Sequence, residues 1–500
     1  MTGLVSKSVA HESESASPAG ESEHFDVVVV GAGISGIGAG YHLGQECPRH
    51  RYVILEGRER LGGTWDLFRY PGIRSDSDMF TLGFPFNPWT ERKAIAEGGT
   101  ILEYLEQTAR KFGIDRHIRY RHMVTRASWS NEDARWTVDA TVDGRAVRFT
   151  CGFLFMCSGY YRYDEGYTPT FPGVERFCGR IVRPQTWTED IDYENKQVVV
   201  IGSGATAVTL IPSLAERAAH VTMLQRSPSY VLSRPSEDAV AQLLNRVLPA
   251  STTYQLVRWK NVLMSTLLYT ISRRIPGRVR KLLIDGVAAQ LSADFDVETH
   301  FGPQYDPWDQ RLCLVPDGDL FATIREGKAS VVTDHIETFT EHGLRLRSGA
   351  ELTADLVVTA TGLQMRFLGG VEVVVDGAVV DAAEHMTYKA MMLSDVPNLV
   401  LSFGYTNASW TLKSELTASY VCRLLLHMER GGYRRCVPRN RDPDVAEVPF
   451  LSLSSGYVQR ARHLFPKQGS RAPWRLKESY LHDLVALRRG AVDDGVMELS

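Results

Sequence analysis

Two glycine-rich turns carry the clearest chemistry in this 500-residue sequence. In the first, Gly31, Gly33 and Gly36 form G-x-G-x-x-G between the apolar run FDVVVV and a helical pattern. The first glycine permits a tight turn, the second lets the backbone approach a pyrophosphate, and the third allows close helix–strand packing. The pyrophosphate would lie at the start of the helix, where unpaired N–H groups attract anions. The turn predicts a dinucleotide-binding unit.

A carboxylate stands where such a unit needs one. Glu56 ends the next apolar run, about 20 residues after Gly36, and is placed to accept hydrogen bonds from an adenosine ribose. With strand, helix and acid all in place, the first unit predicts a cofactor whose ribose carries no 2′-phosphate.

The second turn differs at the corresponding position. It lies in KQVVVIGSGATAVTL and has the form G-x-G-x-x-A, but its second strand ends in Gln225-Arg226 instead of an acid. A guanidinium binds a 2′-phosphate through charge-assisted hydrogen bonds, so NADPH is expected over NADH. The residues predicted to contact it are Gly202, Ser203, Gly204, Ala205, Thr206, Ala207, Arg226 and Ser227. One acidic and one basic site in one chain indicate FAD and NADPH together, with hydride passing from nicotinamide to flavin.

The elements that position these residues read as an α/β fold. Apolar runs with no polar alternation suit strands buried on both faces, as in parallel sheets, so we expect two Rossmann-like dinucleotide-binding domains with a helical insert. Two further apolar runs, 152–160 and 354–363, end at Ser158-Gly159 and Thr361-Gly362. These ends either bring backbone close to a ligand, cross between domains, or are simple turns.

The order of these patterns predicts interleaved domains. The FAD domain is interrupted by the NADP domain, which is interrupted in turn by the helical insert. The predicted parts are a disordered tail (1–23), FAD domain (24–158), NADP domain (159–232), helical insert (233–310), NADP domain (311–366) and FAD domain (367–500).

Between the two turns, FPGVERFCGRIVRPQTW resembles a family fingerprint. Type I Baeyer–Villiger monooxygenases carry F-x-G-x-x-x-H-x-x-x-W there; Phe177, Gly179 and Trp187 match, and Arg183 stands at the histidine position. The resemblance extends from about Phe25 to the region of Leu487. Segments such as GGTWDLFRYPGIRSDSD and FGPQYDPWDQRLCLVP most resemble the ethionamide-activating branch of that family.

The resemblance implies a reaction and its residues. It implies that NADPH reduces FAD, that O₂ adds at flavin C4a, and that the peroxide attacks the ketone of an apolar small molecule to give an ester or lactone, with S-oxygenation of thiocarbonyls or sulfides as a further activity. Asp76 matches the family's active-site aspartate and Arg311 its arginine over the flavin. Gly63, Thr64 and Trp65 resemble the flavin-contacting turn, with Asp76 also beside FAD, and Asn407 and Trp410 are expected near the isoalloxazine.

Arg183 is the main departure from the pattern. Unlike histidine, arginine cannot become neutral, which leads to the hypothesis of altered NADP handling and more peroxide release. Two alternatives stay open: a flavin-containing monooxygenase that oxygenates nitrogen or sulfur without ketone activity, and a degenerate nucleotide-binding protein that is no enzyme. A disulfide reductase is disfavoured because no C-x-x-C pair is present.

Composition narrows the remaining classes. Lys+Arg 56 against Asp+Glu 59 gives a net charge of −3, which does not point to nucleic acid. The 7 cysteines are scattered, so we expect no disulfide framework, no metal site and a reducing compartment, the cytoplasm. Residues 251–284 contain Lys and Arg but no Asp or Glu. This stretch is expected to be a packed helix with basic side chains at the surface, and weak peripheral membrane contact is the alternative. The oligomeric state is not predicted.

Overall fold

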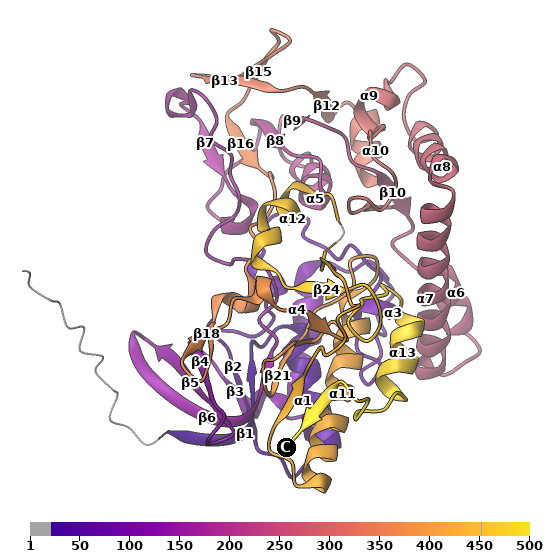
Figure 1. The fold of residues 1–500 in the computed structure, drawn as a ribbon. Coiled ribbons are helices and arrows are strands. Elements are labelled where there is room, and N and C mark those ends of the chain that lie inside the picture. Colours follow the sequence, from indigo (N-terminus) through magenta and orange to yellow (C-terminus); the bar gives the residue numbers. More distant parts are fainter. Residues whose placement is uncertain (1–21, 452) are drawn as a thin grey trace, which may run out of the picture.

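The computed structural model describes residues 22–451 and 453–500. Most of the predicted tail therefore lies outside the described residues, and the first strand already begins at Glu23. The chain forms two sheet-centred halves, the lower and upper parts of Figure 1, with a long helical segment along one side. The domain boundaries stay a prediction, because the chain crosses between the halves more than once.

The lower half is built on a nine-stranded sheet of order β18-β17-β4-β5-β6-β1-β2-β3, with β21 beside β6. Pairs β1–β2, β1–β6 and β2–β3 are parallel, whereas β4, β5 and β6 are antiparallel. The strands are β1 (Glu23–Val30), β2 (Tyr52–Leu55), β3 (Ile118–Arg119), β4 (Met123–Ser130), β5 (Arg135–Val142), β6 (Arg145–Met156), β17 (Glu372–Val375), β18 (Ala378–Val379) and β21 (Leu399–Leu401).

The continuous apolar run of β1 is explained by burial on both faces. Val27 and Val29 pack into the core beneath the helices, while Val28 and Val30 pack into a second core on the opposite face. All four are at most 7% exposed. This agrees with the expectation for a central parallel strand.

Helices cover the lower sheet, and the C-terminal part of the chain packs around it. In Figure 1, α1 and α11 lie side by side to the right of the sheet. The helices are α1 (Ile34–Glu46), α2 (Thr64–Leu67), α3 (Met79–Leu82), α4 (Gly98–Lys111), α11 (Trp410–Gly431), α12 (Gly456–Ala461) and α13 (Tyr480–Arg488). The small strands here are β19 (Thr387–Tyr388), β20 (Met392–Leu393), β22 (Cys436–Pro438), β23 (Glu447–Pro449), β24 (Lys467–Gly469) and β25 (Met497–Leu499).

The upper half is a five-stranded parallel sheet of order β12-β9-β8-β16-β7. Its central strand β8 repeats the logic of β1: Val198 and Val200 face one core, and Val199 and Ile201 face the other. The elements are β7 (Arg180–Val182), β8 (Gln197–Ile201), α5 (Ala205–Leu214), β9 (His220–Gln225), α10 (Asp319–Arg325), β12 (Ala329–Thr333), β13 (Ile336–Thr340), β14 (Gly343–Leu346), β15 (Glu351–Thr353) and β16 (Leu356–Thr359).

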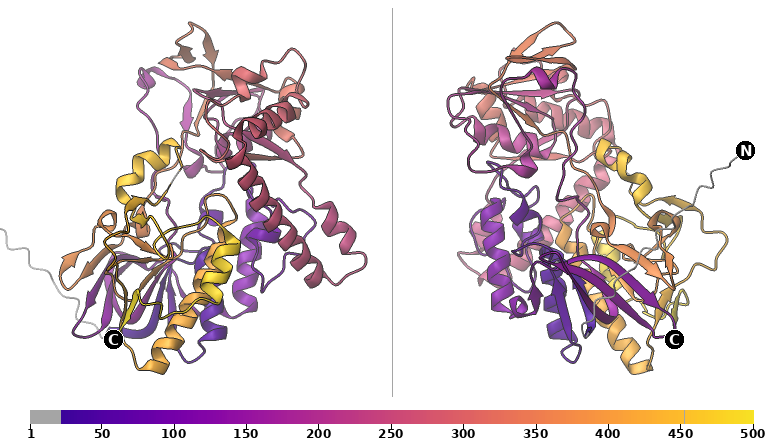
Figure 2. Two further views of the ribbon diagram at one scale, coloured as in Figure 1. Left: turned by 45° about the vertical axis from the view of Figure 1, so that its right-hand side comes forward. Right: turned by 90° about the vertical axis from the view of Figure 1, so that its left-hand side faces the viewer.

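The helical insert leaves the upper half after β10 (Val231–Arg234) and returns at β11 (Cys313–Pro316), which pairs with β10 in parallel. Figure 2 shows its long helices running down one side of the molecule from the upper half to the lower. They are α6 (Ala239–Leu244), α7 (Ala250–Arg274), α8 (Pro276–Ala288) and α9 (Val297–Phe301). The insert therefore connects both halves outside the sheets.

Candidate functional site

The first glycine turn is shaped by strand β6 beside it. Gly31 has φ +103°, and a Cβ there would stand 2.6 Å from the carbonyl oxygen of Cys157, just after β6. Only glycine fits this combination of backbone angle and close approach. Gly33 caps α1, and a Cβ on it would lie 3.5 Å from the Cα of Gly63. At Gly36 a Cβ would lie 1.9 Å from the carbonyl oxygen of Gly31, so the start of α1 packs directly on the turn.

Glu56 follows β2 and is held in one orientation. Its Oε2 accepts a hydrogen bond from the backbone N–H of Ala32 at 2.7 Å, and its Oε1 accepts one from Arg58 N–H at 2.9 Å. The side chain is buried, which raises the pKa of the carboxyl, while these two hydrogen bonds favour the charged form. The structure thus places a fixed acceptor beside the glycine turn, as the sequence predicts.

The turn of Gly63, Thr64 and Trp65 faces the first glycine turn. Gly63 has φ +56° and caps the short helix α2, in which Thr64 and Trp65 are the first residues. Trp65 is half-buried and packs against the lower core. Behind this turn lies a group that the sequence analysis missed: buried Asp66 forms ion pairs with Arg58 at 2.8 Å and with Arg69 at 3.0 Å. A lone Asp in sequence gives no sign of partners three and eight residues away.

Asp76 and Arg311 form an ion pair. Asp76 Oδ2 lies 2.7 Å from a terminal nitrogen of Arg311, and the side chains are 35% and 36% exposed. Asp76 raises the pKa of Arg311 above its ordinary value, so the guanidinium keeps its charge. Tyr160, Tyr161 and Tyr457 lie close enough to act on the same pKa. The pair is therefore an oriented cation that remains open to solvent and is bordered by aromatic side chains.

An aromatic wall connects this pair to the first helix. Tyr160 stacks on Trp410 with ring centroids 5.1 Å apart, and Trp410 Nε1–H donates to Ser35 Oγ at 2.7 Å. Burial raises the pKa of Tyr160 to about 12, so its phenol stays protonated at neutral pH. The side-chain amide of Asn407 donates to the carbonyl of Glu478 at 2.9 Å.

The second glycine turn has the same shape and a more open surface. Gly202 has φ +144°, and a Cβ there would stand 2.3 Å from the carbonyl oxygen of Ala360, at the end of β16. Around Gly204, by contrast, no atom of the described residues lies within 4 Å of a built Cβ. Ser203 Oγ donates to the carbonyl of Ser227 at 2.9 Å, which joins the turn to the end of β9. Ala205 and Thr206 begin α5, and Ala207 is buried.

Arg226 follows β9 and points outward. It is exposed and takes part in no ion pair among residues 22–451 and 453–500. The preceding Gln225 is buried and donates to the carbonyl of His300 at 2.7 Å, so it anchors the end of the strand. Arg226 and Ser227 are both presented to solvent at the edge where an adenosine would lie.

Tyr70 and Cys313 link the Asp76–Arg311 pair to the second glycine turn. Tyr70 lies beside both Thr206 and Asp76; burial raises the pKa of its phenol to about 12. Cys313, two residues after Arg311, has its Sγ 3.8 Å from the carbonyl of Ser203. The Asp76–Arg311 pair therefore lies near the second glycine turn, and the wall of Tyr160 and Trp410 links it to Ser35 at the start of α1.

The fingerprint segment, residues 177–187, runs from before β7 to after it. Phe177 is half-buried against Phe339, with ring centroids 5.8 Å apart, and Trp187 is buried. Gly179 comes directly before β7, and Arg183 is exposed directly after it. Arg183 and Thr206 line one cleft, which places the departure from the family pattern next to the second glycine turn.

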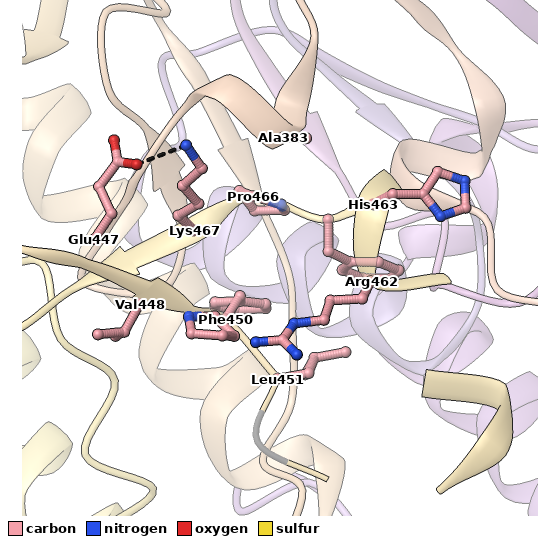
Figure 3. A pocket seen from close by; sticks show the side chains of 11 residues that line it. Ala383, Glu447, Val448, Phe450, Leu451, Arg462, His463, Pro466 and Lys467 are labelled. Carbon is pink, nitrogen blue, oxygen red and sulfur yellow. Dashed lines mark hydrogen bonds and ion pairs between the residues drawn. The ribbon is translucent and has the colours of Figure 1, made fainter. Parts of the chain in front are cut away.

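A separate cleft opens in the C-terminal part, between the paired strands β23 and β24 and the residues that follow α12 (Figure 3). Its volume is about 350 Å³. Lys467 pairs with Glu447 at 2.6 Å on one side, and Arg462 and His463 lie on the other. None of the predicted site residues lines this cleft.

The basic stretch of the insert is largely neutralised by the fold. Arg258 is buried and donates to the carbonyls of Phe80 and Gly83 at 2.7 and 2.9 Å. Ion pairs join Lys260 to Asp238, Arg273 to Asp309, Arg280 to Glu298 and Lys281 to Asp285. Several apolar side chains of α7, such as Leu263 and Leu267, are nevertheless more than half exposed. Peripheral membrane contact stays a prediction.

Within 22–451 and 453–500, no group of three or more His, Cys, Asp or Glu could hold a metal ion. Over the same residues, no helix is both long and apolar enough to cross a membrane.

This chain is similar to known proteins over most of its length. A family model described as flavin-binding monooxygenase-like matches residues 83–396, and one described as an NAD(P)-binding Rossmann-like domain matches residues 29–93. The FAD-containing monooxygenase EthA of Mycobacterium tuberculosis is 56% identical over 473 residues, covering 94% of this chain and 97% of the relative. EthA of Mycolicibacterium smegmatis is 54% identical, covering 94% and 96%.

Solved structures show the same fold. An oxidized steroid monooxygenase bound to NADP has a TM-score of 0.71 at 24% identity, covering 84% of this chain and 88% of that one. A cyclohexanone monooxygenase bound to ε-caprolactone has a TM-score of 0.74 at 19% identity, covering 96% and 100%. These matches confirm the predicted α/β fold with two dinucleotide-binding domains, and the relatives in the preceding paragraph confirm the predicted family.

Proposed function

The chain belongs to the flavin-binding monooxygenase-like family and is an FAD-dependent monooxygenase that uses NADPH, and from this premise we propose that it inserts oxygen into ketones. The products would be esters or lactones, and thiocarbonyls or sulfides would be oxygenated at sulfur. Bound FAD would supply the redox chemistry, taking a hydride from NADPH and passing the electrons to O₂, whose second oxygen leaves as water. The observation that carries the proposal is the Asp76–Arg311 pair near the second glycine turn.

The first turn fits FAD. Gly31 and Gly33 leave backbone N–H groups at the start of α1 accessible to a pyrophosphate, and Gly63 faces them without a side chain. Glu56 is already oriented by Ala32 and Arg58, and its remaining lone pairs can accept ribose hydroxyls. Gly63, Thr64, Trp65 and Asp76 would border the flavin end.

The second turn fits NADPH. The surface at Gly204 is open to an approaching pyrophosphate, and Ser203, Ala205, Thr206 and Ala207 form the start of α5 there. Arg226, which has no carboxylate partner among the described residues, would bind the 2′-phosphate with Ser227 beside it.

Arg311 would stabilise negative charge on the reacting oxygens. Its guanidinium stays protonated throughout, so it donates hydrogen bonds without giving up a proton. Asp76 fixes its orientation through the 2.7 Å contact, which reduces the reorganisation needed when charge develops. The aromatic side chains of Tyr160 and Trp410 would exclude water and favour an apolar substrate.

An N- or S-oxygenating enzyme without ketone activity is the second candidate. A soft sulfur or nitrogen attacks oxygen directly and develops no oxyanion on a substrate carbon, so it would depend less on Arg311. The presence of Arg311, a cation oriented by Asp76, favours the ketone reaction. All 7 cysteines are unpaired, and we propose a cytoplasmic location on that basis.

Substitution of Arg311 tests the proposal. Arg311→Ala should lower ketone oxygenation about 100- to 1,000-fold, the usual loss of one oxyanion donor. The rate of anaerobic flavin reduction by NADPH should fall much less, as should oxygenation of a thioether. Arg274→Ala, an exposed arginine at the end of α7, is the control and should change neither. Undiminished ketone turnover in Arg311→Ala would contradict the proposal.

A further inference from the structure

A cleft lies at the edge of the upper sheet, where β7 and β16 end. Arg183 and Gln185 follow β7, Thr359 and Ala360 end β16, and Thr206 belongs to the first turn of α5. Gly166 and Thr168, from the segment that enters this half, complete the wall with Phe68 from the lower half. The cleft is small, with a volume of about 30 Å³, and is partly open to solvent.

Gln185 presents an acceptor to this cleft that nothing in the protein satisfies. The residue is 7% exposed. Its Nε2 donates to the carbonyls of Arg162 and Tyr163 at 2.6 and 2.9 Å, which fixes the orientation of the amide. Its Oε1 is buried and has no hydrogen-bond partner among the described residues. Because a buried acceptor without a donor is costly, a ligand donor is the expected partner.

Two neighbouring residues also indicate that a ligand binds here. Thr168 Oγ1 is also buried without a partner among the described residues. A Cβ built on Gly166 would come within 3.1 Å of Gln185 Oε1, so the absence of a side chain there keeps the space in front of the acceptor open. A cleft with two unsatisfied polar atoms and an exposed guanidinium at Arg183 is suited to a polar, hydrogen-bonding ligand.

The sheet order shows which ligand would reach this place. A dinucleotide bound to such a fold straddles the carboxyl ends of the strands on either side of the first strand. Here β9, with Arg226 at its end, lies on one side of β8, whereas β16 and β7 lie on the other. If the adenosine 2′-phosphate is at Arg226, the nicotinamide half must extend over β16 towards β7, where the cleft lies.

We propose that Gln185 and Thr168 bind the nicotinamide riboside half of NADPH. Gln185 Oε1 accepts a hydrogen bond from the carboxamide N–H or a ribose O–H, and Thr168 Oγ1 supplies a second contact. The inference rests on the proposed NADPH site at Gly202–Ser227 and adds the part of that site that positions the hydride-donating ring. Gln185 and Thr168 are positioning residues in this scheme.

The test uses two variants that disturb no hydrogen bond in the protein. Thr168→Val removes a hydroxyl that has no partner, and Gly166→Ala crowds Gln185 Oε1 while leaving its amide bonds intact. In the holoenzyme, each should weaken NADP⁺ binding about five- to tenfold by calorimetric titration, the loss expected for one hydrogen bond. The melting temperature should stay the same or rise in Thr168→Val, because an unsatisfied buried hydroxyl is removed.

A fragment separates this inference from the proposed function. Adenosine 2′,5′-bisphosphate carries the 2′-phosphate but no nicotinamide, so both variants should bind it as the wild type does, whereas Arg226→Gln should lose it. Failure of the wild type to bind this fragment would count against the NADPH site itself. Unchanged NADP⁺ affinity in both variants, or equal weakening for NADP⁺ and the fragment, would overturn the role of Gln185 and Thr168.

Discussion

The two glycine turns have a similar backbone shape, but protein atoms surround the first turn more closely than the second. At the first turn, a Cβ built on Gly33 would lie 3.5 Å from the Cα of Gly63, and both oxygens of Glu56 accept backbone hydrogen bonds. Around the second, no described atom lies within 4 Å of a built Cβ on Gly204, and Arg226 is exposed with no ion pair among the described residues. One site is enclosed and oriented, and the other is open.

The difference matches two ways of holding a cofactor. A site whose acceptor and turn are already fixed loses little freedom on binding and can hold its ligand through many turnovers. A cofactor that delivers a hydride must leave and be replaced each cycle, so an open surface with an exposed cation serves it better. The enclosed turn suits FAD, and the open turn suits NADPH.

The largest expected contrast comes from an alanine in each turn. Gly31→Ala forces a Cβ to 2.6 Å from Cys157 O at φ +103°, so the purified protein should lack flavin absorbance or fail to fold. Gly204→Ala meets only open space at an ordinary φ of −83°, so it should keep its flavin and show only a raised KM for NADPH. Flavin retention in Gly31→Ala, or flavin loss in Gly204→Ala, would break the comparison.

A second contrast concerns pH and the helices behind the turns. His42 of α1 contacts Glu46 at 2.5 Å and Glu415 of α11 at 3.1 Å. Burial lowers its pKa, but the two carboxylates outweigh burial and raise it to about 9. Because the folded pKa lies above the unfolded value of 6.5, this stabilisation is complete below pH 6.5 and is lost as pH rises through 9.

Denaturant unfolding of the holoenzyme checks this effect. Between pH 6 and pH 9.5, roughly 3 kcal/mol of the free energy of unfolding should disappear in the wild type, at about 1.4 kcal/mol per pKa unit. His42→Gln should flatten that part of the pH dependence, and His335→Gln, at an exposed position, should not. Helix α5 contains no ionisable side chain, so the second turn has no counterpart to this effect. Parallel curves for wild type and His42→Gln would exclude it.

The smallest contrast tests the charges at the two strand ends. Arg226→Gln should raise KM for NADPH about 10- to 100-fold, as expected for a charge-assisted hydrogen bond to phosphate, and leave KM for NADH nearly unchanged. Steady-state assays with both nucleotides measure this. An equal loss with NADH would mean that Arg226 acts on the fold instead of the 2′-phosphate.

Local pattern was sufficient for the parts of the site that lie within one βαβ unit. Strands β1 and β8, the two turns, Glu56 and Arg226 are each specified by residues within about 30 positions, because a strand, its turn and its helix form one contiguous unit. The Asp76–Arg311 contact joins residues 235 positions apart, and only the family resemblance pointed to it. Asp66 with its arginines, and His42 with Glu415, gave no local signal at all.

The basic stretch of the insert shows why local charge can mislead. Residues 251–284 contain no Asp or Glu, yet Asp238, Asp309 and Glu298, which lie outside the stretch in sequence, form ion pairs with three of its cations. Arg258 is buried against backbone carbonyls and presents no charge to the surface.

The sequence by itself determined the elements and the identity of two nucleotide-binding units, since periodicity and glycine spacing act over short distances. The tertiary structure decided which side chains meet, which cations are neutralised and which polar atoms are left without a partner. Gln185 illustrates the division. Its sequence position marks only a residue after a strand. The two hydrogen bonds that its Nε2 donates, and its Oε1 without a partner, exist only once Arg162, Tyr163 and Gly166 are folded around it. Burial and hydrogen-bond satisfaction are properties of the packed chain, and for that reason they could not be read from the order of its residues.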